Sequence, residues 1–359
     1  MTQTVSIALV GLGNVGRNVL ELLIAKEEHI RKRYDLAIKI VGAADSSGAA
    51  LFAPEGSRSP FVLGPKPEGL DARELLELKK AKRGVATLPR HGQPAMSAAQ
   101  MLEKCGAEVL LELSPTNLTD GQPGLGACET AIARGMHIVL ANKGPLVLAY
   151  PRLAEEAARK HVRLAFSATV AGGLPTVNIG RRDLGVATIE RIEGILNGTT
   201  NFIITSMAEN GMSYADALKI AQARGIAETD PTLDVEGYDA ANKLLILAHA
   251  ALDYHVLLKD VEIAGITNVT MDDLARAKSE GKVLKLLCLA RRDGDGYRLS
   301  VKPTALPAAH PMARLSADQM GVMYTTDING EIVAYIEEGN PLPTAAAVVR
   351  DLVNLVAGS

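Results

Sequence analysis

The sequence has no tryptophan, and aromatic residues make up only 3 % of its 359 positions. Cysteine is also scarce, with only Cys105, Cys128 and Cys288. The three are odd in number, far apart and in no Cys-x-x-Cys spacing. This pattern argues against a disulfide framework or a zinc site and favours a reducing compartment. There is no apolar stretch of about eighteen residues, and the first residues lack a basic region ahead of a separate apolar run, so we expect a cytoplasmic protein.

An excess of charge of one sign is also missing, since the formal net charge is −3. No basic stripe is available to capture nucleic acid or an anionic membrane, so a small molecule is the expected partner. What the chain does have is 47 % hydrophobic residues, which must pack mainly as Ala, Leu, Val and Ile. This composition is typical of a globular protein, and the length predicts two domains rather than one.

The first half of the chain alternates between strand and helix patterns. A short β-rich run at 5–10 breaks at glycine and continues as a helix, and a second strand follows at 37–44. We interpret 46–97 as a long loop insertion with one helical patch near Leu75. Strands are then predicted at 108–113, 137–141 and 163–166, and helices at 126–133 and 152–160. The alternation predicts an α/β fold with a parallel sheet covered on both faces.

From about residue 188 the order changes to a strand at 189–196, several helices, and strands near 297–301 and 332–335. This order predicts an α+β substrate domain. We place the domain boundary at 150, with a first domain at 1–150 and a second at 151–343. The last apolar helix, within 344–359, is expected to return to the first domain.

A glycine motif follows the first strand and opens the first helix, with Gly11, Gly13 and Gly16 around Asn14 and Val15. The first glycine permits a tight turn, the second lets a pyrophosphate approach the backbone, and the third allows close helix packing. Amides at the helix start then bind phosphate. The motif predicts a Rossmann-type dinucleotide-binding domain. The competing interpretation is a glycine turn without a ligand.

Asp45 ends the second predicted strand, where a carboxylate can accept hydrogen bonds from both hydroxyls of the adenosine ribose. This position favours NAD over NADP. Two alternatives remain open: Asp45 starts a turn in Asp-Ser-Ser-Gly, or the two serines and Arg58 accommodate a 2′-phosphate.

Two polar loops follow later strands of the first domain. Ser114 begins Ser-Pro-Thr-Asn, and Lys143 lies in Ala-Asn-Lys-Gly-Pro-Leu. Ligands of open α/β sheets bind beyond the carboxyl ends of the strands, so both side chains are candidates for contact with a cofactor or substrate. An ordinary Ser-Pro turn and a solvated lysine are the competing interpretations.

The densest polar stretch runs over 225–243, where Asp239 and Lys243 are four residues apart and share one helix face. Apolar residues continue around all sides of the same helix, so it is expected to be buried. A charged pair at the mouth of a buried helix is costly to maintain, whereas a surface pair would be unremarkable. Lys243 is therefore a candidate general acid or base. Upstream, Thr199 or Thr200 is expected to cap a helix whose amides hold a carboxylate.

Taken together, these segments resemble homoserine dehydrogenase, in the family's order, over nearly the whole chain. The most specific match spans 221–243, where Gly225, Asp230-Pro231, Asp234, Gly237, Asp239 and Lys243 fall at the spacing of the family signature. Independent matches come from ANKGPL, ATVAGGLPTV, GILNGTTNFI, HPMARL and TTDINGE.

The resemblance implies interconversion of L-homoserine and L-aspartate 4-semialdehyde with NAD or NADP. It implies Lys243 as the proton-transfer residue, with Asp239 as its partner and a substrate ligand. Glu228 would hold the substrate ammonium, with Thr199 and Asp234 in the same pocket.

Further residues are assigned by the same resemblance. Lys143 would lie between cofactor and substrate and count among the catalytic groups. The second domain would be catalytic and would form a homodimer. A main-chain site for a monovalent cation such as sodium would involve the carbonyls of Val170 and Gly172, although Ser167 stands where many members have Glu. Residues expected to contact the cofactor are Gly11, Gly13, Asn14, Val15, Gly16, Asp45, Ser114, Lys143 and Gly339.

Two departures from the family pattern leave alternatives open. No aspartokinase or ACT domain is recognised in the chain, so threonine feedback through such a domain is not expected. The family's Gly-x-Gly-Ala-Gly loop is replaced by Ile336-Glu-Glu-Gly-Asn340, which places Glu338 at a glycine position. A dehydrogenase for another semialdehyde or amino alcohol is therefore one rival interpretation. A cofactor-binding regulatory protein without activity is the other.

Overall fold

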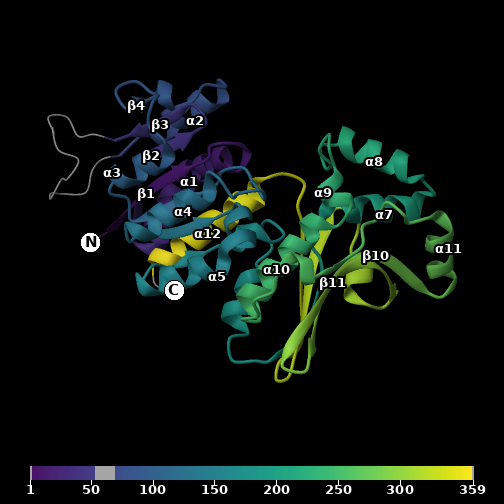
Figure 1. Cartoon of the computed structure of the whole chain (residues 1–359). Helices are drawn as coiled ribbons and strands as arrows, with labels where there is room; N and C mark the ends of the chain where they lie inside the picture. The colour runs from purple at the N-terminus through teal and green to yellow at the C-terminus, as the bar shows by residue number, and fades with distance from the viewer. Residues whose placement is uncertain (1, 53–68, 358–359) are drawn as a thin grey trace. The chain divides into compact units, whose positions relative to one another are not determined.

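The computed structural model describes residues 2–52 and 69–357. They divide into two compact units, one of 2–52, 69–169 and 341–357 and the other of 170–340 (Figure 1). The boundary at 150 falls inside helix α5 (Gly144–Arg159), and β7 (Leu164–Ala165) still pairs with the first sheet. The first unit therefore extends further along the chain than the sequence indicated. Among the described residues, no helix has the length and apolar character needed to cross a membrane.

The first unit contains a sheet of seven strands in the order β4-β3-β2-β1-β5-β6-β7. Five of them are parallel, and β3 and β4 form an antiparallel extension at one edge. The order reverses direction between β1 and β5, which is the switch point where such sheets bind ligands. The strands are β1 (Gln3–Val10), β2 (Leu36–Asp45), β3 (Gly48–Leu51), β4 (Gly92–Gln93), β5 (Val109–Glu112), β6 (His137–Leu140) and β7.

Helices cover both faces of this sheet. Right-handed crossovers run in opposite directions from the switch point, so the helices that directly follow β1 and β5 lie on opposite faces. On one face α1 packs against α2 and α12, and on the other α4 packs between α3 and α5. Their bounds are α1 (Asn14–Tyr34), α2 (Ala72–Lys80), α3 (Ala98–Lys104), α4 (Gly124–Ala133), α5 and α12 (Leu342–Val356).

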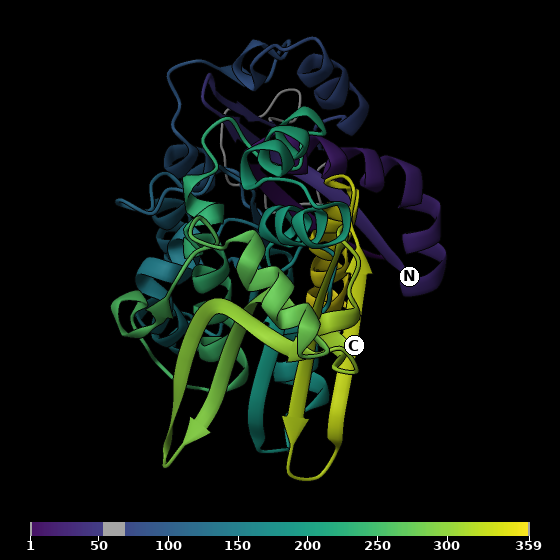
Figure 2. The same ribbon diagram turned by 90° about the vertical axis from the view of Figure 1, so that its right-hand side faces the viewer.

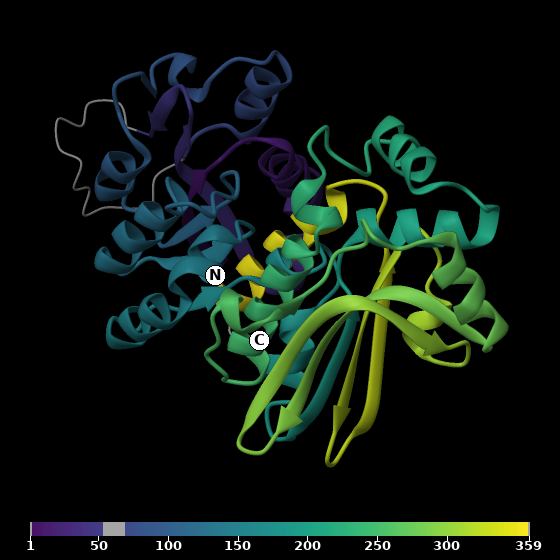
Figure 3. The same ribbon diagram turned by 45° about the vertical axis from the view of Figure 1, so that its right-hand side comes forward.

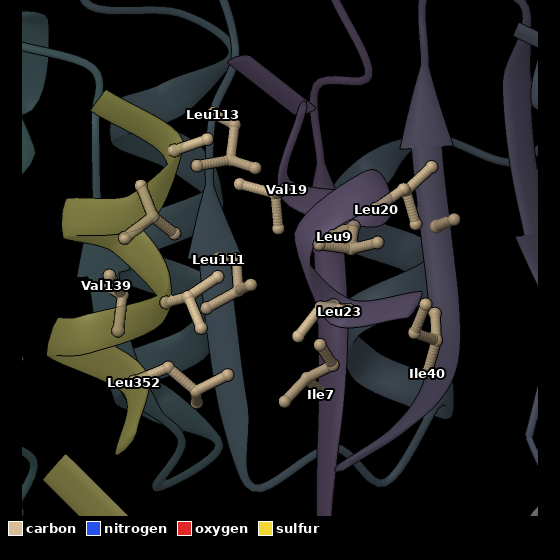
Figure 4. Packing of buried hydrophobic residues seen from close by; sticks show 14 of the residues in the cluster. Ile7, Leu9, Val19, Leu20, Leu23, Ile40, Leu111, Leu113, Val139 and Leu352 are labelled. Atoms are coloured by element: carbon tan, nitrogen blue, oxygen red, sulfur yellow. The ribbon is translucent and has the colours of Figure 1, made fainter. Parts of the chain in front are cut away.

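Figure 4 shows the core of the first unit, in which α1 and α12 lie against the central strands. Leu20 and Leu23 of α1, Leu352 of α12, Ile7 of β1 and Leu111 of β5 are all buried there. β1 is buried on both faces over its last six residues, as expected for a central parallel strand. The end of the chain thus completes the core of its first domain.

The prediction of one long loop over 46–97 is wrong. The described part of this range contains β3, α2, a 3-10 turn at Val85–Thr87 and β4. Ala49 and Ala50 of β3 are fully buried, but small side chains give little hydrophobic contrast. The helical patch near Leu75 is α2, and Arg58 lies outside the described residues.

The second unit contains a sheet of six strands in the order β13-β12-β8-β10-β11-β9. Figures 2 and 3 show its two long hairpins, β10–β11 and β12–β13, which flank β8. The α/β fold with a second, α+β unit is therefore confirmed. The strands are β8 (Ile189–Ile195), β9 (Glu262–Ile263), β10 (Lys282–Asp293), β11 (Gly296–Pro307), β12 (Gln319–Thr326) and β13 (Gly330–Glu337).

Each strand predicted late in the chain is half of a hairpin whose other half was missed. β10 mixes Lys285 with a continuous apolar run, which hides the alternation expected of a strand. The helices of this unit are α6 (Thr176–Asn178), α7 (Gly198–Asn210), α8 (Tyr214–Ala223), α9 (Thr232–Val235), α10 (Tyr238–Ala251) and α11 (Met271–Ser279).

Candidate functional site

The glycine turn of the first unit has the geometry of a phosphate-binding loop. Gly11 has a φ of +93°, and a Cβ there would come within 2.4 Å of the Ser114 backbone nitrogen. A Cβ on Gly16 would lie 2.4 Å from the carbonyl oxygen of Gly11, so only glycine allows α1 to pack this closely. A Cβ on Gly13 would meet nothing within 4 Å, which leaves room for a ligand at the helix start.

The first turn of α1 also offers unused hydrogen-bond donors. Among the described residues, no side chain caps this helix at Gly13. Asn14, at its first position, accepts a hydrogen bond from Arg17 at 2.5 Å through its side chain, and Val15 packs partly against the core. The amides of this turn are therefore suited to a phosphate group.

Asp45 ends β2 as predicted, but its oxygens are engaged within the protein. Lys79 of α2 donates to Oδ2 at 2.6 Å, and the backbone N–H of Val85 donates to the same oxygen at 3.1 Å. Ser47 donates to Oδ1 through its backbone N–H and its hydroxyl. Burial acts to raise the pKa of Asp45, but these hydrogen bonds outweigh it and lower the pKa. Asp45 thus starts the turn at Ser47, which was one of the two alternatives. It also ties β2 to α2 and to the 3-10 turn that begins at Val85, which the sequence did not indicate.

The loops after β5 and β6 are joined by a hydrogen-bond chain. Ser114 donates to Glu112 through both its backbone N–H and its hydroxyl, and its hydroxyl accepts from Asn142 Nδ2 at 3.2 Å. Asn142 Oδ1 in turn accepts from the N–H of Gly144 at 2.8 Å, at the start of α5. Lys143 is half-buried between these two residues. The structure therefore brings the two predicted loops together and adds Glu112 and Asn142 to them.

In the second unit, Asn197 organises the start of α7. Its Oδ1 accepts from the Thr200 N–H at 2.9 Å, so Asn197 caps the helix rather than Thr199 or Thr200, because the helix begins at Gly198. Its Nδ2 donates to Asp234 at 2.7 Å and to Asp239 at 2.9 Å. The motif Gly-Ile-Leu-Asn-Gly-Thr-Thr contained this asparagine, and its position before a helix was the signal for the cap.

Lys243 and Asp239 form the predicted pair on α10. The ammonium lies 2.7 Å from Asp239 Oδ2 and also donates to the carbonyl oxygen of Leu196 at 2.7 Å. Their side chains are 13 % and 14 % exposed, so the pair is largely shielded yet still reachable. Buried leucines and alanines surround the rest of the helix. This arrangement holds an ammonium at a fixed position beside the α7 start.

Not all of the remaining predicted substrate residues contact this pair or its neighbours. Thr199 donates to the carbonyl oxygen of Ile226 at 3.0 Å, which places the segment before Glu228 beside α7. Glu228 itself is exposed, and within 2–52 and 69–357 no hydrogen bond or ion pair joins its carboxylate to Asp234, Asp239 or Lys243. The structure thus groups Thr199, Asp234, Asp239 and Lys243.

The turn around Val170 and Gly172 lies under the altered loop. Glu338 Oε2 accepts from the N–H of Gly173 at 3.1 Å, and a Cβ on Gly172 would come within 2.1 Å of that carboxylate. The carbonyl oxygen of Val170 accepts from the Thr176 hydroxyl at 3.1 Å. Glu338 therefore faces backbone of its own unit, and Gly339 beside it is exposed.

Ser167, where many family members have Glu, is used inside the first unit. Its backbone N–H and hydroxyl donate to Asp351 of α12 at 2.8 and 2.6 Å, and Arg350 donates to its hydroxyl at 3.0 Å. The serine thus anchors the last helix to the end of the first segment.

A protein-family model described as homoserine dehydrogenase matches residues 175–353. The chain is 34 % identical to the homoserine dehydrogenase of Methanocaldococcus jannaschii over 97 % of its own length and 98 % of that protein. The chain belongs to the homoserine dehydrogenase family. Its reaction is therefore the NAD(P)-dependent interconversion of L-homoserine and L-aspartate 4-semialdehyde.

Two further members of the homoserine dehydrogenase family are similar over nearly their full lengths. The NAD(+)-dependent homoserine dehydrogenase of Pseudomonas canavaninivorans is 34 % identical, over 97 % of this chain and 95 % of that one. A crystal structure of a putative homoserine dehydrogenase from Archaeoglobus fulgidus is 33 % identical, with a TM-score of 0.84 and coverage of 98 % and 99 %.

Proposed function

We propose that this chain carries out the family's reaction with Lys243 as the group that takes the hydroxyl proton of homoserine. The observation that carries this proposal is the position of the ammonium, 2.7 Å from both Asp239 Oδ2 and the Leu196 carbonyl oxygen. Two acceptors fix the amine, and the third ammonium hydrogen position remains for a substrate oxygen.

The proton transfer is derived from the residues of the second unit. In its neutral form Lys243 accepts the alcohol proton, and Asp239 then stabilises the ammonium that results. In the reverse direction the ammonium returns that proton to the oxygen of the semialdehyde. When bound, NAD(P) supplies the hydride acceptor.

The substrate pocket is built on the α7 start and the segment 226–239. The amides of the first turn of α7 are suited to the amino-acid carboxylate, beside Thr199. Asp234 and Glu228 supply negative charge for the substrate ammonium. Lys143 is proposed to contact the cofactor, since it follows β6, the strand next to β5.

The cofactor residues fit a dinucleotide, because Gly13 leaves open space and the α1 amides lack a side-chain cap. We propose NAD as the preferred cofactor. Two facts support it: Asp45 ends β2, and the relative from Pseudomonas canavaninivorans is NAD(+)-dependent. A carboxylate at that position disfavours a 2′-phosphate, although Lys79 offsets part of its charge.

We further propose a homodimer, a cytoplasmic location and a place in aspartate-derived synthesis of threonine and methionine. Support for the dimer comes from β13, an edge strand whose Val333 and Tyr335 are 42 % and 63 % exposed. A sodium ion fits the carbonyls of Val170 and Gly172, because oxygen ligands beside the Glu338 carboxylate suit a hard cation.

The test is oxidation of homoserine with NAD and with NADP in parallel, together with a panel of other amino alcohols. The proposal expects homoserine to give the highest kcat/KM and NAD to be preferred. Higher kcat/KM for another amino alcohol would support the rival substrate. Cofactor binding without any turnover would support the regulatory alternative.

A further inference from the structure

A buried carboxyl group that the proposed mechanism does not use lies at the centre of the first sheet. Glu112 is the last residue of β5 and pairs with Val10 on β1 and with Leu140 on β6. Its side chain is 0 % exposed. It therefore stands at the carboxyl edge of the sheet, directly beside the β1/β5 switch point.

The two oxygens of this carboxyl have different surroundings. Oε1 accepts both the N–H and the hydroxyl of Ser114. Within the described part of the chain, Oε2 is buried without a hydrogen-bond partner of good geometry. A Cβ on Gly124 would lie 3.1 Å from Oε2 and 2.4 Å from Asn142 Nδ2, so this glycine leaves the space that the carboxyl and the amide fill.

The charge of this carboxyl is poorly compensated. Burial raises the pKa of Glu112 to about 7, although the hydrogen bonds from Ser114 and the nearby Asn142 amide act to lower it. From α4 the titratable group that faces it is Cys128, which burial keeps in the neutral thiol form by raising its pKa. β1 and β6 present uncharged Val10 and Leu140, and the loop after β6 presents the Asn142 amide. Near neutral pH the carboxyl is therefore divided between its two protonation states.

The position of Glu112 at the end of β5 places it on the side of the sheet where the nicotinamide half of a dinucleotide binds. A dinucleotide crosses the switch point, with its adenosine half over β1 and β2 and its nicotinamide half over β5 and the strands beyond. Ser114, which is assigned to the cofactor, is one hydrogen bond away from Glu112. The oxidised nicotinamide ring carries a positive charge, and the reduced ring is neutral.

We propose that Glu112 is a positioning residue whose loss of a proton is coupled to the binding of the oxidised, positively charged cofactor. This proposal rests on the proposed function, specifically on Ser114 as a cofactor contact. A positive ring over β5 attracts the carboxylate form, so the proton leaves Glu112 for solvent when oxidised cofactor binds. The neutral reduced ring lacks this attraction.

The experiment measures dissociation constants of NAD and NADH without substrate, between about pH 5.5 and pH 8.5, on either side of the pKa of Glu112. The ratio of the two constants cancels effects common to both cofactors. In the native enzyme the preference for NAD over NADH should rise by roughly three- to tenfold across this range. In Glu112→Gln the ratio should be independent of pH.

Glu108→Gln provides a matched control at the other end of β5. Glu108 also accepts from a serine, through the Ser6 N–H at 2.7 Å and the Ser6 hydroxyl at 3.0 Å, but it lies at the amino edge of the sheet. This variant should keep the pH dependence of the native ratio. Proton release on mixing with NAD at pH 7 in weak buffer should occur in the native enzyme and in Glu108→Gln, and should be lost in Glu112→Gln.

A native ratio that does not change with pH, or native binding of NAD without proton release, would overturn the proposal even if Glu112→Gln fails to fold. Unchanged pH dependence in folded Glu112→Gln would do the same. These are equilibrium measurements that need no turnover. Lys243→Ala should therefore show the native ratio, and normal turnover in that variant would remove the proposed function of Lys243 without affecting Glu112.

Discussion

Each of the two units contains a lysine–aspartate pair, and the two pairs are almost equally close. Lys79 lies 2.6 Å from Asp45, and Lys243 lies 2.7 Å from Asp239. Asp45 also accepts hydrogen bonds from Ser47 and from the backbone N–H of Val85. The Asp45–Lys79 pair therefore connects the end of β2 to α2 and to the segment at Val85. Similar ion-pair geometry thus serves a structural purpose in the first unit.

The second pair is connected to different groups. Asp239 also accepts from Asn197, which caps α7 and holds Asp234, while Lys243 also donates to the Leu196 carbonyl oxygen. These contacts join three polar residues of the family signature at one helix start. The surroundings of an ion pair, rather than its length or burial, therefore indicate whether its lysine can act on a substrate.

Lys285 of β10 extends the comparison, because its ammonium bonds to three neutral oxygens. Asn201 Oδ1, the Thr205 hydroxyl and the Leu315 carbonyl oxygen lie 2.8, 2.9 and 2.8 Å from it. Burial lowers the pKa of Lys285 to about 8, and Glu209 partly opposes this. The side chain is 1 % exposed, so this lysine is inaccessible to substrate and links α7 to the loop before β12.

The largest expected effect separates the two paired lysines. Lys243→Ala should lower kcat for homoserine oxidation by about 10²-fold or more, the usual contribution of a positioned proton carrier, with cofactor affinity almost unchanged. The matched variant Lys79→Ala should change kcat little. Steady-state kinetics provide the measurement. Equal losses of kcat in the two variants would show that the two lysines do not differ in their role.

The second prediction concerns Lys285→Met, which removes the ammonium donor from three buried oxygens. The free energy of unfolding should fall by about 3 kcal/mol, as for other losses of a buried hydrogen-bonded charge. Urea denaturation provides the measurement. A loss below about 0.5 kcal/mol, the range of ordinary surface substitutions, would show that the network contributes little.

The pH dependence of stability provides a second test of the buried Lys285 ammonium. Between about pH 8 and pH 10.5 the folded state binds fewer protons at Lys285 than the unfolded state does. The stability of the native protein relative to Lys285→Met should therefore increase as pH rises through this range. A difference that stays constant or shrinks would contradict the buried location of the ammonium.

The third prediction tests the first pair. Asp45→Ser removes an acceptor from Lys79 and should lower the free energy of unfolding by about 1–2 kcal/mol. It should also weaken NAD more than NADP, because only NAD has a free 2′-hydroxyl for the carboxylate to accept. Binding titrations with both cofactors decide this point, and an unchanged ratio would mean that Asp45 serves the internal contacts alone.

The smallest expected effect is that of Glu338→Gly. Its carboxylate lies on the Gly172–Gly173 turn, and we expect it to repel the substrate carboxylate. The variant should increase kcat/KM for homoserine by a factor equivalent to ~1 kcal/mol of transition-state stabilisation at low salt. The increase should be smaller at high salt. A change that is absent at both salt concentrations would leave Glu338 with its backbone contact only.

The features that the sequence predicted are those that depend on local spacing. The glycine motif, the alternation of the first half and the Asp239–Lys243 pair all depend on residues a few positions apart. The Asp45–Lys79 contact spans 34 residues, and the Lys285–Asn201 contact spans 84. Such pairs depend on how β2 meets α2 and how β10 meets α7, which periodicity does not encode. Glu112 was missed because a single carboxylate at the end of an apolar strand has no spacing signal.

Rescue of Lys243→Ala by added primary amines tests directly whether Lys243 transfers the proton. If Lys243 transfers the proton, small amines such as methylamine should restore part of the lost rate in proportion to their concentration. The rescued rate should increase with the basicity of the amine in the direction of homoserine oxidation. Lys79→Ala should show no such response. Lys243→Ala with near-native turnover, or inactive and insensitive to every amine that fits the vacated space, would contradict the assignment of proton transfer to Lys243.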